Sequence, residues 1–141
     1  MSNVSVTKQS ISLEAAERAV AAAKAKAVEL NVPMTIAVAD EAGTLKAYAR
    51  MEGASLLSVQ VAIDKAYTSA ISGFDTEGFF DFIKGDPPLL AGVPNLPRVM
   101  VFGGGVPLTS GGATIGGIGV SGGHWSDDVK VAQAGAAALG Q

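Results

Sequence analysis

Apolar side chains recur three and four positions apart near the start of the chain, which is the spacing of one helical face. Ser12 can cap such a helix, and Asn31 followed by Pro33 can end it. We therefore predict a helix over residues 12–30 that packs closely against another surface. Its apolar face consists of Leu13, Ala16, Val20, Ala23, Ala27 and Leu30.

Residues 34–50 change to a pattern that is typical of strands. The run MTIAVAD is almost wholly apolar, as expected for a strand buried on both faces. The turn Asp40–Gly43 separates it from a second strand, TLKAYAR. The pattern predicts a β-hairpin in which Asp40 forms the turn.

Residues 55–72 return to the helical spacing, and Gly73 is placed to end the helix. The expected core face carries Leu56, Val59, Ile63, Ala66 and Ala70. A different face is small and polar around one long cation, and it consists of Ser58, Val61, Lys65, Thr68 and Ser72.

The second half of the chain begins with segments rich in phenylalanine and then proline. We predict a short helix near Thr76–Lys84 and then a stiff loop over 86–97. A small core of Phe74, Phe79, Phe80 and Phe82 is the expected role of the aromatic cluster, and the loop could act as a lid or an oligomer contact.

Three further strands, VMVF, VPLT and ATIGGIGVSG, are expected to form a meander. The run SDDVKVAQAGAAAL then predicts a final helix, with Ser126 as its cap and Asp127 and Asp128 in its first turn.

The composition limits the class of protein. A chain of 141 residues matches one domain, which we place over 1–141. Hydrophobic residues make up 48% and charged residues only 16%, below the usual quarter, so we expect something to cover more of the surface than in a monomer. No apolar run approaches the roughly 18 residues needed to cross a bilayer. The start MSNVSVTKQS has no signal-peptide pattern, so we expect a cytoplasmic protein without a membrane partner.

Cysteine and histidine counts narrow the possible chemistry. The chain has no cysteine and one histidine, His124, so we expect no disulfide and no metal site. The net charge is −3, and the ten basic residues are scattered, which argues against a nucleic-acid partner.

The stretch GGATIGGIGVSGGHW, residues 111–125, contains a G-x-G-x-x-G pattern at Gly117, Gly119 and Gly122. A dinucleotide fingerprint needs a helix that opens inside it and an acidic residue about 20 positions later. The chain ends before that position, and the first two glycines fall within a predicted strand. We therefore interpret the glycines as places where a helix or ligand approaches the backbone, and 121–124 as the rim of a binding site beside a helix start.

The order of these motifs resembles the GlcG/HbpS-like family, also called the haem-degrading domain family or DUF336, to which the C-terminal domain of PduO is related. The matching pieces span nearly the whole chain: IAVADEAGTLKAYARMEGA, AIDKAYTSA, GGGVPLTSGGATIGGIGVSGG and DDVKVAQAG. The long glycine-rich run with SGG is the most specific of them.

The resemblance implies an α+β, profilin-like fold in which helices pack on the faces of a five-stranded antiparallel sheet. It also implies a homo-oligomer, often an octamer. Family members are linked to haem or corrinoid binding, so haem is a candidate cofactor, while other members are encoded beside catabolic enzymes. His124 stands where the family often has a small or polar residue.

Several residues are candidates for a ligand site. Lys65, which lies in the matched KA-x-T piece, could clamp an anion or pair with Asp64 or Glu52. Arg50 could bind a carboxylate, and Met51 could ligate haem iron or simply fill the core. The full set of expected ligand-binding residues is Arg50, Lys65, Thr68, Ser121, Gly122, Gly123 and His124.

These candidates support three hypotheses. The first is a protein that holds haem or another small molecule near Lys65, Arg50 and the SGG turn. The second is a cofactor-independent enzyme of small organic acid catabolism, an isomerase, hydrolase or lyase, with His124 and Lys65 as catalytic residues and Arg50 and Lys65 as a carboxylate clamp. The third is a structural oligomer or the partner of another enzyme.

Overall fold

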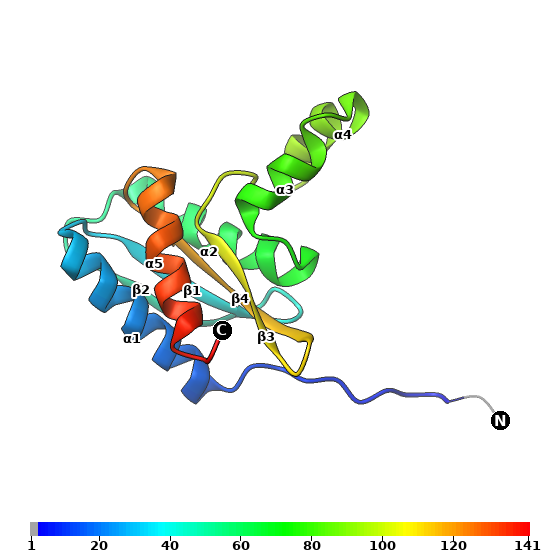
Figure 1. Ribbon diagram of the computed structural model, residues 1–141, viewed down its shortest axis with the longest axis horizontal. Coiled ribbons are helices and arrows are strands. Elements are labelled where there is room, and N and C mark those ends of the chain that lie inside the picture. The colour runs from blue at the N-terminus through cyan, green and yellow to red at the C-terminus, as the bar shows by residue number, and fades with distance from the viewer. Residues whose placement is uncertain (1–2) are drawn as a thin grey trace.

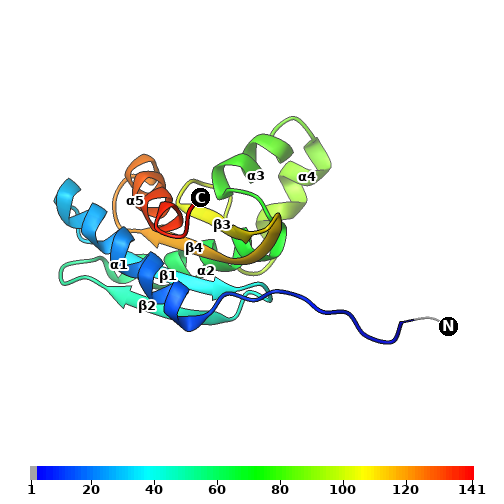
Figure 2. The same ribbon diagram turned by 60° about the horizontal axis from the view of Figure 1, so that its bottom comes forward.

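A computed structural model describes residues 3–141 and shows a four-stranded antiparallel sheet between two layers of helices (Figures 1 and 2). The strand order is β2–β1–β4–β3. The strands are β1 (Thr35–Asp40), β2 (Leu45–Arg50), β3 (Gly105–Ser110) and β4 (Ala113–Ser121). The helices are α1 (Leu13–Leu30), α2 (Leu56–Ser72), α3 (Thr76–Ile83), α4 (Pro87–Gly92) and α5 (Trp125–Ala137), and a 3₁₀ turn, η1 (Val93–Asn95), follows α4.

The buried strand β1 divides the core into two parts. Ile36 and Val38 point to the face covered by α1 and α5, whereas Ala37 and Ala39 point to the face covered by α2. This alternation is that of a strand buried on both sides, as the apolar run predicted. The β1–β2 hairpin is also confirmed, and the Asp40 carboxylate accepts hydrogen bonds from two amides of its turn.

Helix α1 forms where the sequence predicted it. The Ser12 hydroxyl accepts a hydrogen bond from the Ala15 amide, and Asn31 ends the helix in the left-handed conformation. The buried face differs from the prediction at two positions, because Leu13 is 50% exposed and Ala19 is fully buried, while Val20 and Leu30 pack against the core as predicted. The alanine-lined face lets α1 lie close to α5 (Figure 1).

Helix α2 has the predicted bounds, and its predicted core face is confirmed in part. Ala66 and Ala70 face the sheet and Ile63 packs beside them, but Ala62 joins this face while Leu56 is 81% exposed. The physical reason lies in β4, where a Cβ added to Gly119 would collide with backbone atoms of α2. Helix and strand therefore touch through their backbones, and large side chains do not fit between them.

The segment before β3 differs most from the predictions. The expected loop over 86–97 contains α4 and η1, because Pro87 starts α4 and the Asp86 carboxylate caps it. The expected strand VMVF does not form, since the Met100 amide donates to the Thr68 hydroxyl and not to a neighbouring strand. The sheet therefore has four strands, not five.

Helices α3 and α4 project from the body of the molecule (Figure 1). The phenylalanine cluster is partly confirmed, because the Phe74 ring lies 5.2 Å from both Phe79 and Phe82, measured between ring centroids. Phe82, however, is 60% exposed. Within residues 3–141, no helix combines the length and apolar character that a membrane crossing requires.

Candidate functional site

A pocket of about 280 Å³ lies where β4 ends and α5 begins, and we call it the SGG pocket. The polypeptide from Ser121 to Trp125 forms one side of it, and the first turns of α2 form another. Its apolar walls are Leu57, Val61, Phe102 and Trp125. The structure thus brings four of the predicted site residues together, Ser121, Gly122, Gly123 and His124.

A buried ion pair between Lys65 and Asp128 lies next to this pocket. The Lys65 ammonium is fully buried and donates to the Val120 carbonyl at 2.9 Å and to Asp128 Oδ2 at 3.1 Å. Asp128 Oδ1 accepts a hydrogen bond from the Gly123 amide at 3.1 Å. Burial lowers the pKa of Lys65 and raises the pKa of Asp128, and the opposite charge of each partner offsets part of the shift.

Gly104 makes room for the ion pair. Its φ of +125° belongs to glycine, and a Cβ there would lie 2.7 Å from Lys65 Nζ and 2.9 Å from Asp128 Cβ. The ammonium also lies 4.8 Å from the centroid of the Phe102 ring, within the range of a cation–π contact. Lys65 therefore holds both the turn and one wall of the pocket, without lining the pocket itself.

His124 lies exposed at the mouth of the SGG pocket and caps α5, a role that the sequence assigned to Ser126. Its Nδ1 accepts from the Ser126 amide at 3.2 Å and lies 2.8 Å from the Ser126 hydroxyl. The cap lies two residues earlier than predicted, because the His124 imidazole accepts a hydrogen bond from a first-turn amide, as a serine or asparagine side chain commonly does. In residues 3–141, Nε2 makes no hydrogen bond, so it is free to meet a ligand.

The amides at this helix start are less available to an anion than we expected. The Gly123 amide already donates to Asp128, and the Ser126 amide donates to His124. An anionic ligand would have to displace a bonded side chain at either position. The rim is therefore better suited to a ligand that binds through His124 and the apolar walls.

Two predicted site residues lie elsewhere. Arg50 lines a separate pocket of about 340 Å³ with Lys24 and Met51. The Thr68 hydroxyl donates to the Arg98 carbonyl and accepts from the Met100 amide, both at 3.0 Å, so it fixes the loop before β3.

Neither Asp64 nor Glu52, the two partners predicted for Lys65, forms an ion pair with it. Asp64 pairs with Arg98, at 3.0 Å between Oδ1 and Nε, and Glu52 lines the pocket of Arg50. The residues that sequence reasoning missed as site components are Asp128, Phe102 and Trp125. The sequence does show that Asp128 lies in the first turn of the helix after SGG. It does not show that Asp128 pairs with Lys65, which is 63 positions away in sequence.

The family model described as "Haem degrading protein HbpS-like" matches residues 11–137. The chain belongs to the HbpS-like family. The resemblance found in its motifs is thereby confirmed. A relative from Citrobacter freundii, the 15.0 kDa protein in the dhaT-dhaS intergenic region, is 35% identical over 124 residues, which are 87% of each protein.

Two solved structures of HbpS-like relatives share the fold. The Klebsiella pneumoniae protein ORFY has a TM-score of 0.90 and 29% identity, and the match covers 99% of this chain and 97% of ORFY. The structure titled "PduOC:Heme Complex" has a TM-score of 0.84 and 32% identity, with 92% of this chain and 94% of that chain covered. The α+β architecture with an antiparallel sheet is therefore that of the family.

Proposed function

We propose that this protein binds haem, or another flat tetrapyrrole, over the opening of the SGG pocket, since a volume of about 280 Å³ is too small to enclose a macrocycle. The observation that carries the proposal is an exposed imidazole with a free Nε2 at the mouth of a pocket with apolar walls. Apolar and aromatic side chains suit the faces of a macrocycle, and imidazole is a common ligand of haem iron. The haem complex of the PduOC relative supports the same ligand class.

His124 fits an iron ligand better than Met51 does. The Met51 sulfur accepts a hydrogen bond from the Met34 amide at 3.4 Å, and Met51 lines the pocket of Arg50 and not the SGG pocket. Ligation through Nε2 requires the proton on Nδ1, which can then donate to the Ser126 hydroxyl at 2.8 Å. With the proton on Nδ1, that nitrogen can no longer accept from the Ser126 amide, so ligation gives up this cap hydrogen bond and the Ser126 hydroxyl alone orients the imidazole.

Different residues around the pocket would bind the iron, contact the macrocycle and fix the turn. His124 would bind the iron through Nε2, Trp125 and Phe102 would pack against the macrocycle, and Lys65 with Asp128 would keep the turn rigid. Bound haem would supply an iron centre whose chemistry depends on its protein ligand and on the polarity around it.

A hemin titration followed by visible absorbance tests the proposal. We expect a saturable, shifted Soret band in the wild type, its loss in His124→Ala, and an unchanged band in the control Met51→Leu. Because His124 also caps α5, its removal should cost about 0.5–2 kcal/mol of stability, so circular dichroism must show that the variant is folded. Ser126→Ala should retain haem but shift the band. Equal binding by wild type and folded His124→Ala would contradict the proposal.

The enzyme hypothesis requires Arg50 and Lys65 to clamp one carboxylate beside His124, and the structure does not bring these three residues together. Arg50 lines another pocket, and the Lys65 ammonium is committed to Asp128 and to the Val120 carbonyl.

We also propose that the protein forms a homo-oligomer, an octamer by the family resemblance. Large apolar side chains left on the surface support this assembly, because packing between copies would bury them. They include Leu56, Phe82 and Leu96, which are 81%, 60% and 52% exposed. Sedimentation velocity should give the mass of eight chains, and a monomer at micromolar concentration would refute the assembly. The cytoplasmic location remains a prediction.

A further inference from the structure

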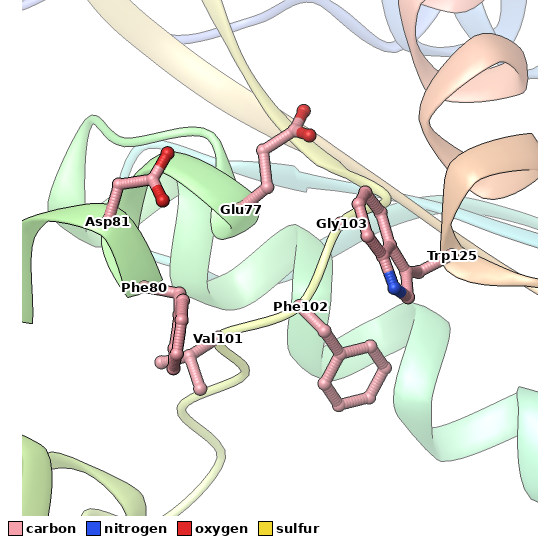
Figure 3. A pocket seen from close by; sticks show the side chains of 7 residues that line it. All are labelled: Glu77, Phe80, Asp81, Val101, Phe102, Gly103 and Trp125. Atoms are coloured by element: carbon pink, nitrogen blue, oxygen red, sulfur yellow. The ribbon is translucent and has the colours of Figure 1, made fainter. Parts of the chain in front are cut away.

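A second pocket, of about 500 Å³, lies next to the SGG pocket, and we call it the aromatic pocket (Figure 3). The two pockets share Phe102 and Trp125 as a common wall. Phe80 of α3 and Val101 form further apolar walls. Phe80, Phe102 and Trp125 are 42–44% exposed, so apolar surface of these side chains remains open to a ligand. Its volume lies within the range of about 300–1,000 Å³ that small-molecule sites usually have.

The charged groups of the aromatic pocket are all acidic. Glu77 and Asp81 lie one turn apart on α3, and their carboxylates lie on the same side of the pocket (Figure 3). Asp81 pairs with Lys84 at 3.0 Å, but both side chains of that pair are more than half exposed, so water screens it. Within residues 3–141, Glu77 has no basic partner closer than 4 Å.

The environment of Glu77 favours the arrival of a positive charge. Burial, reinforced by the negative charges of Asp75 and Asp81, raises the pKa of Glu77. A cation beside this carboxylate would relieve both the desolvation and the repulsion between like charges. The electron-rich faces of Phe80 and Trp125 attract cations as well, whereas the Phe102 ring already has the Lys65 ammonium 4.8 Å from its centroid.

These features select one class of ligand. A metal ion is a poor match, because residues 3–141 contain no group of three side chains that could hold one. An anion would be repelled by the two carboxylates. We propose that the aromatic pocket binds a small organic cation with a flat apolar body, such as an aromatic ammonium compound. The apolar body would lie against Phe102 and Trp125, and the charge would face Glu77.

This site shares Phe102 and Trp125 with the proposed haem site, but the two proposals depend on different polar residues. The haem proposal depends on His124, which does not line the aromatic pocket. The cation proposal depends on Glu77, which does not line the SGG pocket. Substitutions at these two positions therefore distinguish failure of one proposal from failure of the other.

The fluorescence of Trp125, the only tryptophan in the chain, provides the test. We would titrate the full chain with N-methylquinolinium, a flat aromatic cation. The neutral probe is quinoline at mildly alkaline pH, and the anionic probe is naphthoate. We expect saturable quenching by the cation, binding of quinoline that is weaker by roughly tenfold, and no saturable quenching by naphthoate.

Two variants of matched chemistry complete the test. Glu77→Gln should weaken cation binding by roughly tenfold, whereas Glu17→Gln, on the exposed face of α1, should leave it unchanged. His124→Ala should still bind the cation. Thermal unfolding would confirm that Glu77→Gln is folded. Three outcomes would overturn the proposal: quenching of the wild type that does not saturate, equal affinity for quinoline and the cation, or wild-type affinity in Glu77→Gln.

Discussion

Removing one partner of the buried Lys65–Asp128 pair should cost the fold far more than removing one partner of a similar pair at the surface. Removing Lys65 by substitution with methionine leaves the Asp128 carboxylate, which is 2% exposed, with the Gly123 amide as its remaining hydrogen-bond donor. Loss of one partner of a buried pair costs about 3–5 kcal/mol. For a chain of this length, that corresponds to a decrease in Tm of about 6–20 °C.

A double-mutant cycle measures the interaction directly. The variants are Lys65→Met, Asp128→Asn and the double variant, and the assay is urea unfolding followed by circular dichroism. The double variant should lose at least about 1–2 kcal/mol less than the sum of the single losses, because it leaves no isolated charge behind. The natural control is Lys84→Met, since Lys84 and Asp81 form a pair of the same types at 3.0 Å on the surface. That change should cost less than about 1 kcal/mol.

Two results would refute this reasoning. If the two single losses simply added in the double variant, Lys65 and Asp128 would not depend on each other. If Lys65→Met cost no more than Lys84→Met, burial would not strengthen the dependence on the partner. Either result would also remove the argument that the ion pair keeps the SGG turn rigid.

Two further predictions concern the glycine contact and the acidic pocket. Gly119→Ala should destabilise the fold by about 1–3 kcal/mol or prevent folding, because the added carbon meets the α2 backbone, whereas Gly85→Ala has open space and should be neutral in thermal unfolding. Since the pKa of Glu77 is raised, binding of N-methylquinolinium should decline as the pH falls through that raised value, which lies above the ordinary value of glutamate. Over the same range Glu77 itself contributes the opposite trend to folding, because protonation relieves its buried charge. As the pH falls, the wild type should therefore gain free energy of unfolding relative to Glu77→Gln, and a relative loss would contradict this reading.

The sequence predicted the elements whose signals are local. The alanine spacing and Ser12 located α1, and the apolar run before Asp40 located the hairpin, because caps, turns and periodicity act over a few residues. The same logic failed for VMVF. Its apolar character was that of a strand, but the decisive contact, from the Met100 amide to Thr68, joins residues 32 positions apart.

The site was predictable only in part for the same reason. The SGG turn and His124 are contiguous, so their joint position followed from the chain. Lys65 was recognised as unusual from its small neighbours, but its partner depends on how α2 and α5 meet around the end of β4. The bulk of Leu56 suggested a core residue, and only the glycine-lined surface of β4 explains why it is left outside.

The backbone contact between α2 and β4 also determines which parts of the pockets can adapt. A helix that rests on Gly119 has almost no freedom to rotate or to accept larger side chains on its inner face. The SGG pocket therefore has one rigid wall. The loop over 99–103 and the projecting helix α3 carry no such restriction. Changes in ligand size or charge during evolution are thus expected to arise in that loop and in α3, while the face of α2 against the sheet stays small and uniform.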